Sequence, residues 1–165
     1  MKKILLSAVL ALSVTAPAYA ASGNTSTVTG SAQANVIAPI VLTHTSGATL
    51  NFGSFTTGTG GTVQVLPDGT GSTTVDVGFV PGSTEAADQF TVKGDVNRSF
   101  AISTSGGSVA NGATTILFTT AASATTGLTS GTGTAAFSVG GTLSVVGTEG
   151  AGAYTGTYNA TVTYN

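Results

Sequence analysis

The sequence predicts an all-β fold, an antiparallel sandwich or barrel with no substantial helix. The clearest observation is the alternation of apolar and polar residues from Tyr154 to the end of the chain, which is typical of a half-buried strand. Along the chain, about nine or ten short strands are indicated at spacings of ~8–12 residues, separated by glycine-rich turns. No connection resembles a crossover helix, so antiparallel pairing is favoured.

The amino-terminal segment predicts export. Lys2 and Lys3 precede an apolar run over residues 4–14, and Ala18-Tyr19-Ala20 forms an A-x-A cleavage pattern. The run is too short to span a bilayer, which takes ~20 apolar residues. We therefore expect residues 1–20 to be a signal peptide and residues 21–165 to be one exported domain, periplasmic and then on the cell surface or outside the cell.

The expected strands follow in chain order. The first places small and apolar residues on one face, namely Val28, Gly30, Ala32, Ala34 and Val36. Further strands are expected at 37–42, 50–55, 62–66, 75–79, 90–92, 100–102, 116–118, 137–139 and 143–145. A turn is expected at 67–69, a hairpin over 94–98 and at most one helical turn at 84–89.

The last strand closes the predicted fold. The residues expected on its inward face are Tyr154, Gly156, Tyr158, Ala160, Val162 and Tyr164. Thr and Asn residues occupy the other face, which is expected to be polar and exposed.

Charge and composition narrow the function classes. After residue 20 the chain has two bases and six acids, a net charge of −4, and no cysteine. Binding of nucleic acid or anionic lipid through a basic patch is therefore not expected. Without disulfides, the fold must depend on packing and on ladder hydrogen bonds.

The sequence contains no recognisable catalytic or metal-binding motif. His44 is the only histidine and is expected to be an isolated surface residue. HExxH and GxSxG patterns are absent, and the carboxylates are scattered. Residues 95–99 match only the start of a calcium loop, so a turn is preferred there. We therefore expect no enzyme activity, cofactor or metal.

Several segments carry a resemblance to a known family. Residues 34–40, 50–55, 67–69, 90–94 and 152–165 are similar to a family of secreted Gram-negative bacterial proteins. That family is known as a domain of unknown function and lies close to the spore coat protein U and pilin-like group.

The chain also resembles subunits of chaperone–usher pili. It ends with Tyr164 one residue from the terminus and Gly152 fourteenth from it, within an alternating final strand. The resemblance implies an immunoglobulin-like sandwich that lacks one strand. It also implies that a periplasmic chaperone, and then the 28–36 segment of a like subunit, supplies that strand, with an outer-membrane usher as a further partner.

Two functions remain open from the sequence. The chain is either a pilin-like subunit of a surface fibre or coat, or a self-complete monomeric surface, matrix or binding protein of unknown ligand. Residues 21–36 distinguish them, because they are donated to a neighbour in the first case and complete their own fold in the second.

Overall fold

The computed structural model describes residues 23, 25 and 27–165, and in this part of the chain it contains strands and no helix. The predicted signal peptide and the start of the predicted extension lie outside the described residues. Residues 27–35 form a unit separate from the folded unit at 36–165, and they carry no regular secondary structure. The strand predicted at 28–36 therefore has no pairing, and Val28 and Val36 are both 92% exposed.

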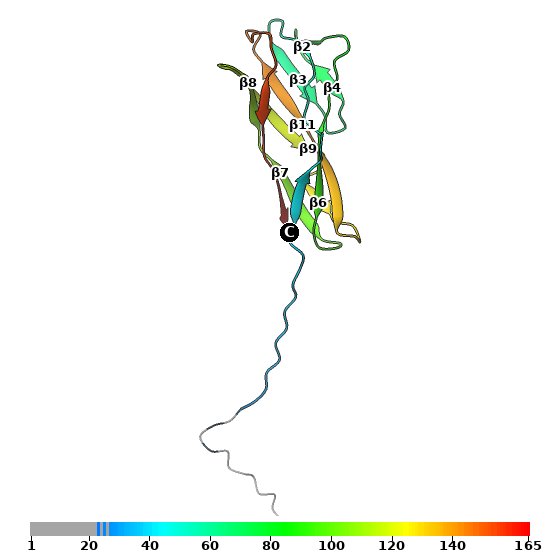
Figure 1. Cartoon of the computed structure of the whole chain (residues 1–165), viewed down its shortest axis with the longest axis vertical. Coiled ribbons are helices and arrows are strands. Elements are labelled where there is room, and N and C mark those ends of the chain that lie inside the picture. Colours follow the sequence, from blue (N-terminus) through cyan, green and yellow to red (C-terminus); the bar gives the residue numbers. More distant parts are fainter. Residues whose placement is uncertain (1–22, 24, 26) are drawn as a thin grey trace, which may run out of the picture. The chain divides into compact units, whose positions relative to one another are not determined.

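The folded unit is an antiparallel β-sandwich, as predicted (Figure 1). The strands of the larger sheet are β1 (Val41–His44), β3 (Gly61–Val65), β4 (Gly71–Thr73), β6 (Asp88–Lys93), β8 (Gly107–Asn111), β9 (Thr114–Ala122), β11 (Thr134–Val145) and β12 (Thr155–Thr157). The smaller sheet has the order β10 (Thr126–Leu128), β7 (Ser99–Thr104), β13 (Ala160–Tyr164). A short ribbon joins β2 (Phe55–Thr56) to β5 (Gly78–Phe79).

The long strand β11 organises the larger sheet. Its first half pairs with β6 and its second half pairs with β3 along the same edge. Strand β9 pairs with the opposite edge. At the change of partner, a side chain on Gly140 would collide with the backbone of Val65 and Leu66. Glycine at this position therefore lets the two backbones approach closely.

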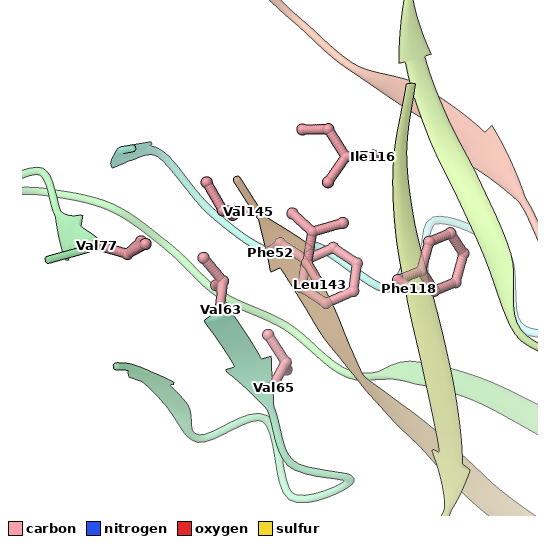
Figure 2. Close-up of a cluster of buried hydrophobic side chains, with 8 residues drawn as sticks. All are labelled: Phe52, Val63, Val65, Val77, Ile116, Phe118, Leu143 and Val145. Atoms are coloured by element: carbon pink, nitrogen blue, oxygen red, sulfur yellow. The ribbon is translucent and has the colours of Figure 1, made fainter. Parts of the chain in front are cut away.

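Two apolar clusters fill the interior. One lies between the sheets and consists of Phe90, Val92, Phe100, Ile102, Phe137 and Val139. The other lies along the second half of β11 and its neighbours β3 and β9. Figure 2 shows its members, Phe52, Val63, Val65, Val77, Ile116, Phe118, Leu143 and Val145. Every one of the strand residues in these clusters follows the period-2 pattern, so the alternation in the sequence predicted the inward faces well.

Several local expectations were wrong. Strands β6 and β7 do not form a hairpin, because they belong to different sheets. The connecting loop instead bonds to a distant turn, with Gly94 N–H donating to Gly133 O and Asn97 N–H donating to Ser130 O. Residues 84–89 form no helical turn, and Asp88 already lies in β6. Residues 50–54 contribute only a single bridge, Asn51 to Ala86.

The break in the 50–55 strand has a local cause. The Asn51 side-chain oxygen accepts a hydrogen bond from Gly53 N–H, and its amide group donates to Thr84 O. Gly53 adopts φ of 74°, outside the range of a strand. The polar side chain thus offers the backbone an alternative to ladder pairing.

Candidate functional site: the open edge of the C-terminal strand

Strand β13 lies at an edge of the smaller sheet. It pairs with β7 in antiparallel register, with Val162 opposite Ile102 and Tyr164 opposite Phe100. No strand of the folded unit pairs with its other side. Across the sandwich, the nearest strand is β1, which is itself at the edge of the larger sheet.

The register shows which backbone groups of β13 face outward. Asn159 O accepts a hydrogen bond from Ser105 N–H at 2.9 Å, and Asn165 N–H donates to Ser99 O at 3.2 Å. Odd-numbered residues therefore bond to β7. In an antiparallel pair the intervening residues direct their N–H and C=O groups away from that partner. The N–H and C=O groups of Ala160, Val162 and Tyr164 thus form what we call the open edge.

The side chains of the same residues are incompletely covered. Ala160, Val162 and Tyr164 pack against the buried cluster between the sheets, yet each is only partly buried. Opposite them on β7, Phe100 and Ile102 are 1% and 7% exposed. An alternating apolar face and a row of free backbone groups therefore lie along one strand, which is the chemistry that strand addition requires.

Tyr164 holds the end of β13 in place. Its hydroxyl donates to Ala38 O at 3.0 Å and accepts from Asp95 N–H at 2.6 Å. The Arg98 guanidinium lies 5.3 Å from the centre of the ring, within the range of a cation–π contact. The point where the amino-terminal segment joins the folded unit is thereby fixed beside the end of β13.

A buried carboxylate connects β1, β6 and the segment before β13. Asp88 is 4% exposed. Its Oδ1 lies 2.6 Å from His44 Nε2 and accepts Gln89 N–H at 2.8 Å, while its Oδ2 accepts the Tyr158 hydroxyl at 2.7 Å. The His44 side chain is 49% exposed. A buried carboxylate with several donors is compensated for its lost hydration.

No pattern in the sequence predicted this network. His44 was expected to be isolated, but the antiparallel register of β1 and β6 places it opposite Phe90 and beside Asp88. The two residues are 44 positions apart, so only the strand pairing brings them together.

The predicted final strand is divided between the two sheets. Strand β12, at Thr155–Thr157, pairs with β8, and strand β13 begins only at Ala160. Tyr158 lies at the crossing and packs against both apolar clusters. Tyr154 packs on the second cluster and donates its hydroxyl to Gly150 O, whereas Gly152 and Gly156 are exposed. The uninterrupted strand from Tyr154 to Tyr164 was therefore wrong.

Because of Tyr158, the stability of the fold is expected to decrease at alkaline pH. Burial, together with the hydrogen bond to Asp88 and its negative charge, raises the pKa of the Tyr158 hydroxyl far above its ordinary value. Tyrosine in the unfolded chain ionises near pH ~10 while the folded protein keeps its proton. Stability contributed by this proton is therefore present below about pH 10 and is lost as the pH rises further.

Replacing Tyr158 with phenylalanine is expected to reduce this loss. The ring keeps its packing, but the proton that resists ionisation is gone. Urea unfolding measured at pH 7 and at pH 10.5 checks this expectation. Wild type should lose more stability between the two values than Tyr158→Phe, and an equal loss in both proteins would contradict the assignment.

Two further observations concern other kinds of site. Within the described residues, no group of three or more His, Cys, Asp or Glu side chains is placed to hold a metal ion. The same residues include no helix long and apolar enough to cross a membrane.

Comparison with known proteins identifies the family. A family model described as "Domain of unknown function (DUF4402)" matches residues 42–164. The chain belongs to this family. The match begins within β1 and ends at Tyr164, so the DUF4402 domain comprises the sandwich with β13 and leaves out residues 27–41. Searches of curated proteins and of solved structures found no match.

Proposed function

We propose that this DUF4402 domain is a non-enzymatic structural subunit that assembles by β-strand complementation into a surface fibre or coat. The open edge of β13 carries the proposal. Backbone groups of Ala160, Val162 and Tyr164 lack a strand partner in the folded unit, and their side chains remain partly exposed. An added strand would supply both the hydrogen bonds and the missing apolar contacts.

The segment at 28–36 has the properties of the added strand. It alternates Val28, Gly30, Ala32, Ala34 and Val36 with polar residues, and it carries no secondary structure of its own. Small side chains suit this edge, because the core positions beside β13, at Phe100 and Ile102 of β7, are already buried. In this proposal a periplasmic chaperone first covers the edge, an usher exports the subunit, and a like subunit then donates its segment.

The chain direction of the 28–36 segment favours its donation to another molecule. The segment joins the folded unit beside Tyr164, at the end of β13. To return along its own β13 it would have to reverse over residues 36–39 and would run parallel to that strand. All strand pairs of the folded unit are antiparallel. A segment donated by another copy can pair with β13 in this antiparallel direction. The self-complete monomer is therefore the second candidate.

A peptide of residues 27–37 tests the proposal. Protein lacking residues 21–36 is expected to fold and to bind this peptide, as measured by fluorescence anisotropy of a labelled peptide. Val162→Asp should abolish binding, because it places a charge against the added strand. Thr161→Ser, on the opposite face of β13, is the matched control and should bind as the parent does.

The alternative makes the opposite prediction. A self-complete monomer needs its own residues 21–36 to fold and stays monodisperse at all concentrations. Sedimentation of the full exported chain as a single monomer, together with failure of the shortened chain to fold, would exclude the assembling subunit.

A further inference from the structure

Loops gather at both ends of the long strand β11. Beyond Val145 lie the loops at 57–60, 74–76 and 146–149, which we call the distal end. Asp76 Oδ2 accepts Thr59 N–H at 3.0 Å, and Glu149 accepts the N–H groups of Val146 and Gly147 at 2.7 and 2.8 Å. Before Thr134 lie the loops at 94–98 and 129–133, which we call the proximal end. Figure 1 shows β2 and β3 toward one end of the folded unit and the carboxyl terminus at the other.

The distal end presents apolar side chains to solvent. Val75 is 87% exposed and Val146 is 70% exposed. Val75 also adopts φ of 61°, a left-handed conformation that is strained for a β-branched residue. Within this molecule, no burial of the Val75 side chain offsets this backbone strain. Such an outlier points to a functional contact.

The proximal end is complementary to the distal end in its exposed apolar residues and in its charge. It exposes Val96 at 51%, with Leu128 on the adjoining β10 at 63%. It also carries Lys93 and Arg98, and the sequence has no other Lys or Arg beyond residue 20. Asp95 is the one acid in these loops. The distal end has Asp76 and Glu149 and no base, so opposite charges would meet if the two ends came together.

Strand donation brings these two ends together. An extension that pairs antiparallel with the acceptor's β13 has Val28 near Tyr164 of the acceptor and Val36 toward the acceptor's distal end. The donor's folded unit begins at Val36, and the donor's Ala38 lies beside its own Tyr164 at its proximal end. The donor's proximal end therefore faces the acceptor's distal end.

We propose that the distal end of one copy, through Val75 and Val146, docks on the proximal end of the next copy, at Val96 and Leu128. This inference rests on the proposed function. The contact would add a second interface between the same two subunits. The contact is heterologous, because different surfaces meet, and it repeats along a fibre. The strained Val75 loop is held outward for this partner.

Val75→Asn in the full exported chain is expected to raise stability while it slows assembly, so the two effects can be told apart. Asparagine tolerates the left-handed conformation, so Tm should rise by about 2–4 °C. The apolar contact is lost, so assembly followed by light scattering should slow by about tenfold. Leu117→Asn is the matched control, since Leu117 is 67% exposed on the strand β9 and belongs to none of the loops at either end. It should assemble at the wild-type rate.

The 27–37 peptide distinguishes failure of this contact from failure of the proposed function. Added in excess, the peptide should block wild-type assembly and should bind Val75→Asn and wild type equally. Wild-type rates for Val75→Asn, equal slowing by Leu117→Asn, or weaker peptide binding by Val75→Asn would each overturn the end-to-end contact. Assembly that the peptide does not inhibit would overturn strand donation, and the end-to-end contact with it.

Discussion

Asp88→Ala is expected to lower the free energy of unfolding by about 3 kcal/mol, because it removes a buried carboxylate to which three groups bond. The Tyr158 hydroxyl and the Gln89 N–H both lose their acceptor, and His44 loses its partner. Tyr158 packs at the junction of the two apolar clusters, so its displacement should also loosen the start of β13. Chemical unfolding of the purified protein at pH 7 measures the loss.

A pair of variants tests the cause of this effect. Asp88→Asn retains an acceptor oxygen and nearly the same shape, so it should lose much less stability than Asp88→Ala. His44→Ala removes only the half-exposed partner and should also be milder. If Asp88→Ala were no less stable than His44→Ala, the carboxylate would not be the centre of the network.

Phe100→Ala is expected to cost about 3–5 kcal/mol, as is typical of removing a buried aromatic ring. Phe100 is 1% exposed and lies on β7 directly opposite Tyr164 in the ladder, beside the end of β13. Its ring also lies so close to Gly127 that a side chain there would collide with it, so no neighbour can fill the cavity from that side. Thermal unfolding and binding of the 27–37 peptide should both decline.

Leu128→Ala provides the control for this variant. Leu128 is on β10, opposite Ser99 and next to Phe100 in the ladder, but it is 63% exposed. Its replacement should change stability by less than about 0.5 kcal/mol. Equal losses for the two variants would show that Phe100 does not support the end of β13 as a core residue.

The sequence predicted the class of fold and the inward faces because period-2 alternation directly reflects burial. Val63, Val92, Val139 and Leu143 all lie inward as their spacing indicated. It did not predict where the chain changes sheets. The alternation continues through Tyr158 and Asn159, yet β12 and β13 belong to different sheets, because a change of hydrogen-bond partner leaves no mark on the pattern.

The candidate site was predicted only in part. Alternation located Ala160, Val162 and Tyr164 on one face, but the missing neighbour of β13 is a property of the whole strand order. The Asp88 network depends on the β1–β6 register, which no local motif encodes. The strained Val75 was expected in a strand, and its outward position follows from the contacts of Asp76 with Thr59 and Gly60.

Amide hydrogen exchange along β13 tests the open edge most directly. In protein lacking residues 21–36, the Val162 and Tyr164 amides should exchange rapidly, whereas the Thr161 and Thr163 amides bonded to β7 should be protected. Saturating 27–37 peptide should then protect Val162 and Tyr164. If those two amides were already protected before the peptide was added and unchanged afterwards, β13 would have no open edge and assembly by strand complementation would be contradicted.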